Sequence, residues 1–146
     1  MFTFEKSLFI NRPQQEVFDF LSNPANDAQW QGSTESAEWT SEGPFGVGST
    51  QRSVFRFLGR KIESSTEVTI WDPPNQYSTK VLSGPIPFEI TIKLESQENG
   101  TQVTAGFQAE FGGFFKMAEG LVGKQAAKQF DTDLDALKLL VEGGQV

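Results

Sequence analysis

Four hydroxyl side chains are the residues best placed to hold a ligand. Ser53, Ser64, Thr66 and Thr79 lie on three successive segments that alternate between apolar and polar residues. Such alternation is typical of strands, and it places these hydroxyls on the inner face of a sheet. An unpaired buried hydroxyl costs about 1–3 kcal/mol, so several together indicate a face that water or a ligand reaches. The alternative is a thinly packed sheet centre that holds bound water.

The sequence contains no His and no Cys, which limits its chemistry. It lacks the commonest general base, thiolate nucleophiles, disulfides and Cys-ligated metal sites. Any catalysis would depend on carboxylates, other hydroxyls, Lys, Arg or Tyr77. Glu35 and Glu38 would be the best acid or base candidates if one of them faced a cavity. No residue completes a catalytic pattern, so we assign no catalytic residue and no cofactor.

Two segments match part of a phosphate-binding motif and part of a calcium-binding motif. Segment 43–48 (GPFGVG) is rich in glycine, but a phosphate loop needs Gly-Lys-Ser/Thr at the start of a helix, and here Ser49 begins a strand. The acidic residues of segment 131–142 follow part of a calcium-loop spacing, but Ala136 replaces the required glycine. Apolar residues also keep helical spacing there, and a helix cannot wrap its carboxylates around one ion. We therefore predict a strand connection at 43–48 and no metal site.

Composition restricts the partners. The 146 residues are 37% hydrophobic, with 14 Phe and one Tyr, which suits an apolar pocket or a dry core. A formal net charge of -7 disfavours nucleic acid and anionic membrane surfaces. Residues 1–10 do not resemble a signal peptide, and no apolar run is long enough for stable membrane insertion. We expect a cytoplasmic protein with a small apolar partner, and leave its oligomeric state open.

The order of elements predicts an α+β fold. Segment 2–10 is a predicted strand, and two short helices follow, the second beginning at Asn23-Pro24 and ending near Trp30. Strong breakers then separate alternating segments. The predicted strands are 33–40, 49–58, 61–71, 76–83, 87–96 and 101–111. Residues 114–142 form one predicted long helix, in which Gly120 and Gly123 require either a bend or close packing.

Charge and Phe positions predict the register of the central hairpin. A turn about Gly59-Arg60 would pair Arg52 with Glu67 and Arg56 with Glu63 on a solvated face. The opposite parity defines the inner face. Its predicted residues are Gln51, Ser53, Phe55, Phe57, Ile62, Ser64, Thr66, Val68, Ile70, Tyr77, Thr79, Val81, Phe88, Ile90, Ile92, Leu94, Val103, Ala105, Phe107, Ala109 and Phe111.

Several segments carry a resemblance to a known family. They are RPQQEVFDFLSNP, Trp30, GPFGVGST, LGRKIESSTEVTIWDPP, SGPIPFEITIKLES, NGTQVTAGFQAEFGGFF and the terminal DLDALKLLVE. In this order they resemble the START-like (SRPBCC) superfamily, which includes the polyketide cyclase/dehydrase proteins and the birch pollen allergen. The resemblance covers nearly the whole chain and implies one domain over 1–146. It also implies a helix-grip fold, in which a curved seven-stranded antiparallel sheet wraps around a long C-terminal helix.

The resemblance implies a cavity for lipids, polyketides or similar molecules. We favour binding or carriage of a small hydrophobic ligand over catalysis. The alternatives are a cyclase or dehydrase that uses a carboxylate or hydroxyl in the same cavity, and a protein-interaction module. An exposed apolar patch on the outer sheet face would favour the last, but the predicted outer face is charged.

The expected pocket lies between the sheet and helix segment 114–126, and opens near Gly112-Gly113 and the GPFGVG segment. Phe130, Leu134 and Leu137 are expected to fill the other end. We expect a volume of about 300–1,000 Å³. Trp71 is expected in the core. The predicted ligand-binding residues are Trp30, Trp39, Ser53, Phe55, Phe57, Ser64, Thr66, Thr79, Phe88, Ile90, Phe107, Phe111, Met117, Ala118 and Leu121.

Overall fold

A computed structural model describes residues 2–110 and 119–143. The strands begin and end within two residues of the predicted bounds, and the long helix ends at the predicted residue. The predicted first turn of that helix, 114–118, lies outside the described residues. The elements are β1 (Phe2–Ile10), α1 (Gln14–Leu21), the 3-10 turn η1 (Pro24–Asn26), α2 (Asp27–Trp30), β2 (Thr34–Trp39), β3 (Thr50–Phe57), β4 (Arg60–Asp72), β5 (Gln76–Ser83), β6 (Phe88–Gln97), β7 (Gly100–Ala109) and α3 (Glu119–Glu142).

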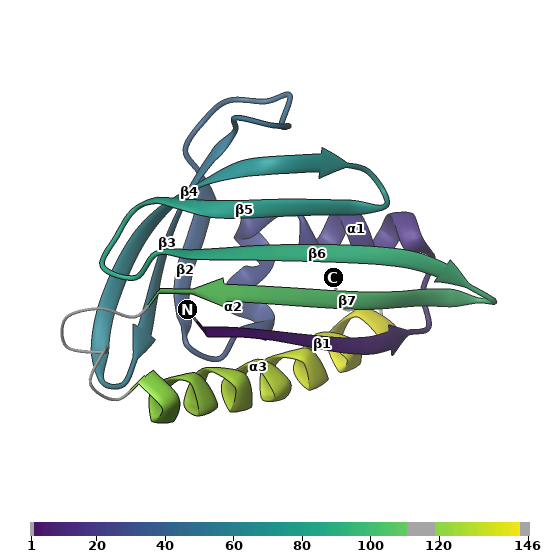
Figure 1. Ribbon diagram of the computed structural model, residues 1–146. Helices are drawn as coiled ribbons and strands as arrows, with labels where there is room; N and C mark the ends of the chain where they lie inside the picture. The colour runs from purple at the N-terminus through teal and green to yellow at the C-terminus, as the bar shows by residue number, and fades with distance from the viewer. Residues whose placement is uncertain (1, 111–118, 144–146) are drawn as a thin grey trace.

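The seven strands form one antiparallel sheet in the order β1-β7-β6-β5-β4-β3-β2. The sheet curls into a half-barrel, with α1 and α2 behind it and α3 running along β1 (Figure 1). This is the predicted helix-grip arrangement. Within the described residues, no helix combines the length and apolarity needed to cross a membrane.

The second short helical segment begins as its sequence predicts. The Asn23 side chain accepts a hydrogen bond of 3.1 Å from the Ala25 N–H, and Pro24 occupies the first position of η1. This capping satisfies an N–H that would otherwise lack a partner. The chain then passes directly into α2, which places Asp27 and Trp30 one turn apart on the same helix.

The buried apolar residues form two clusters. One joins α1, Trp30 and the C-terminal half of α3 to β6 and β7, and includes Phe18, Ile92 and Leu137. The other joins Ile62, Ile86, Ala109 and Val122, with several partly buried Phe side chains packed against it. The inner face of the sheet therefore has two packed regions.

The central hairpin has the predicted faces but not the predicted register. Phe57 pairs with Arg60, and Arg52 lies opposite Ser65 rather than Glu67. The turn is two residues long, Leu58-Gly59, and both residues have positive φ, 51° and 77°. A two-residue turn of this kind matches strand twist. Because it shifts the pairing by two residues relative to our prediction, every side chain keeps its face and only its partner changes.

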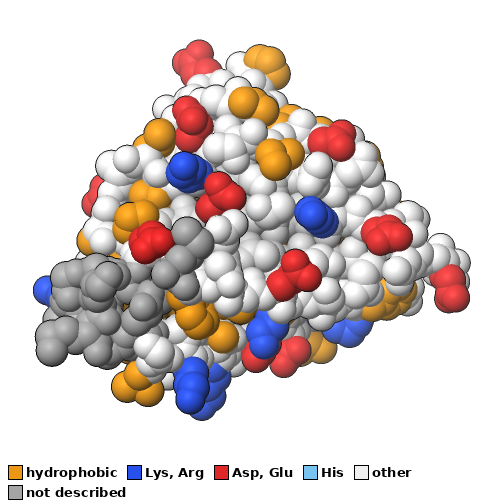
Figure 2. Space-filling view, viewed as in Figure 1, with side chains coloured by type: hydrophobic (Ala, Val, Ile, Leu, Met, Phe, Trp, Pro, Cys, Tyr) orange, Lys and Arg blue, Asp and Glu red, His pale blue; other side chains and the backbone are white. Residues whose placement is uncertain are grey.

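The charged partners on the outer face also differ from the prediction. Arg52 forms an ion pair of 2.7 Å with Glu63 and one of 3.6 Å with Glu38. Arg56 pairs with Glu35 at 2.8 Å instead of with Glu63. Figure 2 shows the outer face with acidic and basic side chains scattered over it.

A bulge in β4 overturns the predicted inner position of Ile70. The register shifts between Val68, which pairs with Thr79, and Ile70, which pairs with Ser78. The extra residue reverses the alternation. Ile70 is consequently 40% exposed. Trp71 turns inward and packs edge-to-face on Phe18, with ring centroids 5.4 Å apart, as expected of a core residue.

Helix α3 is joined to β1 by contacts along its length. A Cβ atom on Gly123 would collide with the Phe2 ring, so this glycine permits close packing, whereas Gly120 has nothing within 4 Å. Lys6 forms an ion pair of 3.2 Å with Asp131, and Lys138 donates a hydrogen bond to the Phe9 carbonyl oxygen. Of the two explanations for the glycines, close packing therefore applies to Gly123.

Candidate functional site

A cavity of about 200 Å³ lies on the inner face of the sheet, bounded by α2 and the middle of α3. All five strands from β3 to β7 contribute to it, and so does the start of β2. Its apolar wall draws on both core clusters, so the cavity is the space left between them. The lining residues are Asp27, Trp30, Gln31, Ser33, Thr34, Gln51, Ser53, Phe55, Phe57, Thr66, Thr79, Ile86, Phe88, Ile90, Phe107, Ala126, Gln129, Phe130 and Asp133.

A continuous series of aromatic rings forms the apolar wall. Phe55 packs edge-to-face on Phe88 with centroids 6.3 Å apart, and Phe88 stacks on Phe107 at 6.0 Å. Phe4 continues the series, stacking on Phe107 at 5.1 Å and meeting Phe130 of α3 edge-to-face at 5.3 Å. Because each ring is held by the next, the wall presents a large apolar surface at little entropic cost.

Polar side chains gather at the α2–β2 side of the cavity. The Thr34 hydroxyl donates a hydrogen bond of 2.7 Å to Gln31. The Asp133 carboxylate accepts hydrogen bonds from the Gly32 N–H, at 3.0 Å, and from the Gln129 side chain, at 2.8 Å. Burial raises the pKa of Asp133, and these two hydrogen bonds oppose the rise. One oxygen of this carboxylate, Oδ1, therefore already accepts two hydrogen bonds from the protein.

Asp27 is the second carboxyl group of the cavity, and its surroundings differ. Its side chain has no hydrogen-bond or ion-pair partner among the described residues. Burial raises its pKa to about 8. Its neighbour Tyr77 donates a hydrogen bond of 2.8 Å to the Leu21 carbonyl oxygen, and burial, followed by the charge of Asp27, raises the pKa of Tyr77 well above its usual value. Asp27 is thus a carboxyl group that is largely protonated at neutral pH.

Two buried polar atoms have no hydrogen-bond partner in the described part of the chain, the Trp30 Nε1 and the Ser64 Oγ. Trp30 lines the cavity and is only 7% exposed. Ser64 does not line it, because Gly84 crosses so near that a Cβ there would lie 2.7 Å from the Ser64 Oγ. Of these two fully buried atoms, the Trp30 Nε1 is therefore the one that belongs to a described lining residue of the cavity.

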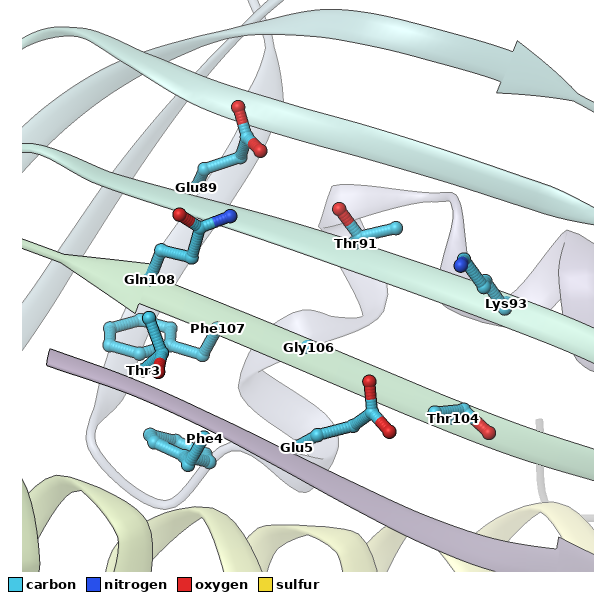
Figure 3. Close-up of a pocket in the computed structure, with 10 residues that line it drawn as sticks. All are labelled: Thr3, Phe4, Glu5, Glu89, Thr91, Lys93, Thr104, Gly106, Phe107 and Gln108. Carbon is cyan, nitrogen blue, oxygen red and sulfur yellow. The ribbon is translucent and has the colours of Figure 1, made fainter.

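A second hollow, of about 400 Å³, lies on the outer face where β1, β7 and β6 run side by side (Figure 3). At its centre is Gly106, where a Cβ would meet only the Thr91 carbonyl oxygen, at 3.9 Å. Glu5, Glu89 and Lys93 surround it together with Thr and Gln side chains. This charged surface suits water better than an apolar molecule.

Comparison with protein families identifies the family to which the chain belongs. Residues 1–142 match the model of the family described as polyketide cyclase/dehydrase and lipid transport. The chain belongs to this family. A search of curated protein sequences finds no match.

Solved structures at low sequence identity share this family member's fold. TTHA0849 from Thermus thermophilus has a TM-score of 0.84 at 20% identity, covering 99% of both chains. A START superfamily protein from Mycobacterium smegmatis has a TM-score of 0.81 at 16% identity, covering 98% of this chain and 99% of its own. The ZhuI aromatase/cyclase from a Streptomyces species has a TM-score of 0.76 at 16% identity, covering 96% and 93%. These structures show the fold that the START-like resemblance implies.

Most of the predicted site residues come together around the cavity of this polyketide cyclase/dehydrase family member. Those that line it are Trp30, Ser53, Phe55, Phe57, Thr66, Thr79, Phe88, Ile90 and Phe107. Phe111, Met117 and Ala118 lie outside the described residues. Trp39, Ser64 and Leu121 do not line it.

Two of these placements correct the prediction for physical reasons. Trp39 stacks on Phe45 of the glycine-rich segment, with centroids 4.0 Å apart, and so belongs to an aromatic cluster at the edge strand β2. Leu121 is 73% exposed, because the neighbouring Val122 is the residue of α3 that turns inward. Among the described residues of α3, those that line the cavity lie within 126–133 and none lies within 119–125, and the described lining includes no residue of segment 43–48. Its volume lies below the expected range.

Sequence reasoning missed the polar side of the cavity, chiefly Asp27, Gln31 and Asp133. Asp133 was considered only within the calcium-like spacing. The signal for Asp27 was available, because a helix starting at Pro24 and ending at Trp30 places Asp27 and Trp30 on one face. The expected acid or base candidates Glu35 and Glu38 instead form ion pairs with arginines on the outer face.

Proposed function

We propose that this protein binds a small apolar molecule in the cavity between the sheet and α3. The observation that supports this most strongly is the series of aromatic rings along one wall, set against a polar opposite side. Ligand sites are typically apolar concavities with a few polar groups that fix orientation. The family description, which includes lipid transport, supports the same class of ligand.

The test is titration with a neutral fluorescent probe, phenylnaphthylamine. Ala126 lines the cavity, and Ala126→Phe should fill part of it and weaken binding about tenfold or more. The neighbouring Gln125 is exposed, so Gln125→Phe adds the same ring to the same turn of α3 outside the cavity. Equal affinity in the unchanged protein and in Ala126→Phe, with the fold retained by circular dichroism, would place the probe elsewhere.

A second candidate function is catalysis in the same cavity, favoured by one observation. Asp27 is a carboxyl group with a pKa near neutral, which suits an acid or base role. As a carboxylate it could take the proton from the carbon next to a carbonyl, and as the acid it could return that proton to the departing hydroxyl, so that water leaves and a C=C bond forms in a cyclase- or dehydrase-type reaction. The test is loss of water from the aldol adduct of benzaldehyde and acetone, followed by the absorbance of benzalacetone. Turnover that disappears in Asp27→Asn would support catalysis, and no turnover above buffer would contradict it.

A further inference from the structure

We infer that the cavity recognises a carbonyl oxygen on its apolar occupant, and that Asp27 and Trp30 donate the hydrogen bonds that hold it. The inference rests on the proposed binding function, because it names the chemistry of the molecule bound. It starts from two donor groups that line the same cavity one helical turn apart.

Trp30 supplies the first donor. Its indole Nε1–H is buried and has no acceptor in the described part of the chain. Buried polar groups almost always have a partner, and an indole nitrogen can only donate. An occupant with an acceptor oxygen at this side of the cavity would remove the cost of the unpaired group.

Asp27 supplies the second donor. A carboxyl group that is ionised needs donors or a cation around it, and the described residues give Asp27 neither. Its pKa of about 8 keeps the group protonated at neutral pH, so it presents an O–H. Two donors without acceptors therefore border the same space.

The titratable groups that face Asp27 from other elements do not prevent it from donating a hydrogen bond to an occupant. Tyr77 on β5 already donates to the Leu21 carbonyl, and Asp133 on α3 already accepts two hydrogen bonds. None of the described lining residues is Lys or Arg. An anionic occupant would thus meet acids without a compensating cation, whereas a protonated amine, which has no acceptor, would leave Trp30 unpaired. An uncharged carbonyl group satisfies both donors.

The size of the cavity limits the rest of the molecule. About 200 Å³, lined by rings from Phe55 to Phe107, accommodates one small aromatic or acyl group. We therefore identify the occupant class as small, apolar ketones, esters or related carbonyl compounds.

The test compares two probes of nearly the same shape, methyl naphthyl ketone and isopropenylnaphthalene, in which a methylene group replaces the carbonyl oxygen. The unchanged protein should bind the ketone roughly tenfold more tightly, as expected for hydrogen bonds made in a water-poor site. As the pH rises through about 8 and Asp27 ionises, this preference should fall, while the affinity for the hydrocarbon stays constant. Asp27→Asn should abolish the pH dependence, because its amide does not titrate.

Two further variants test the donors separately. Asp27→Leu and Trp30→Phe should each lower the ketone-to-hydrocarbon affinity ratio several-fold, whereas Asp135→Leu, on the exposed face of α3, should leave the ratio unchanged. Because the ratio is measured within one variant, a general loosening of the cavity cancels. The pH dependence of the ketone preference is measured on the unchanged protein, so this test remains available even if Trp30→Phe fails to fold.

The possible outcomes distinguish a failure of the carbonyl assignment from a failure of the proposed binding function. Equal binding of both probes would overturn the carbonyl assignment and leave apolar binding intact. A preference that survives in Asp27→Leu and Trp30→Phe would overturn the assignment of the donors. Binding of neither probe would remove the proposed function and the inference together.

Discussion

The carboxylate of Asp133 on α3 accepts a hydrogen bond of 3.0 Å from the backbone N–H of Gly32, in the turn that joins α2 to β2. The Gln129 side chain donates to the same carboxylate oxygen, and a Cβ on Gly32 would come within 3.1 Å of the Gln129 Nε2. The helix therefore holds this turn at close range. Because Trp30 and Thr34 stand on either side of this turn and both line the cavity, the shape of the cavity depends on this contact.

Replacing Asp133 by Ala should lower the free energy of unfolding by about 1–3 kcal/mol, because the Gly32 N–H loses its acceptor. The measurement is urea denaturation. Asp135, which is exposed two residues further along, provides the control, and Asp135→Ala should change stability by less than about 0.5 kcal/mol. Equal effects of the two replacements would mean that the hydrogen bond contributes little.

Asp27 should make stability depend on pH in an unusual direction. Its folded-state pKa of about 8 lies above the ordinary aspartate value of 3.8, so the folded protein binds a proton that the unfolded chain has lost. This contribution is complete below pH 3.8 and declines as the pH rises towards 8. Asp27→Asn does not titrate, so its stability relative to the unchanged protein should increase across this interval. Parallel stability curves for the two proteins would contradict the raised pKa.

Glu142 should change the pH dependence of stability in the direction opposite to that of Asp27. The Asn11 N–H donates to its carboxylate at 2.7 Å and Lys138 at 3.0 Å, and these bonds lower its pKa. Its contribution is therefore present above the unfolded-state pKa and is lost as the pH falls through the lower folded-state value. Glu142→Gln should cost up to about 1 kcal/mol at pH 7 and nothing in acid, measured by thermal unfolding at both pH values. A cost that is the same in acid would indicate a packing effect.

The two glycines near the start of α3 should respond differently to alanine. Gly120→Ala meets no neighbour within 4 Å and should stabilise the protein by about 0.5–1 kcal/mol through helix propensity. Gly123→Ala gains the same propensity but forces the Phe2 ring to move, so it should be the less stable of the pair. Differential scanning calorimetry of both variants provides the comparison. Equal stability would show that the Phe2 ring moves at no cost.

Alternation of apolar and polar residues was sufficient to predict the strands and most of the inner face. It predicted Phe55, Phe88 and Phe107 on the inner face, because a period of two survives any register shift by an even number of residues. It could not predict partners, which depend on the length of the Leu58-Gly59 turn. Nor could it predict the bulge that exposes Ile70, since one extra residue leaves no mark in the pattern.

The candidate site was less predictable, because the polar side of the cavity comes from elements without a periodic signal. Asp27 lies in a helix of four residues, and its partial burial depends on how α2 sits against the sheet and α3. Tertiary packing alone also distinguishes Ser53, which lines the cavity, from Ser64, which Gly84 covers. The prediction placed Leu121 in the site, but the rotation of the helix, which turns Val122 inward and exposes Leu121, depends on contacts with β1.

The first strand of the chain pairs with the last one, so that Phe2 lies opposite Ala109 and Ile10 opposite Thr101. During synthesis on the ribosome, β1 therefore has no strand to pair with until nearly the whole sheet has been made. Loops of this length are slow to close, and they leave an unpaired apolar strand open to other chains in the meantime. A circular permutant that begins at Asn11 would place β1 after α3, so that each strand pairs with the strand that precedes it in the chain, and it should complete its sheet with a shorter search.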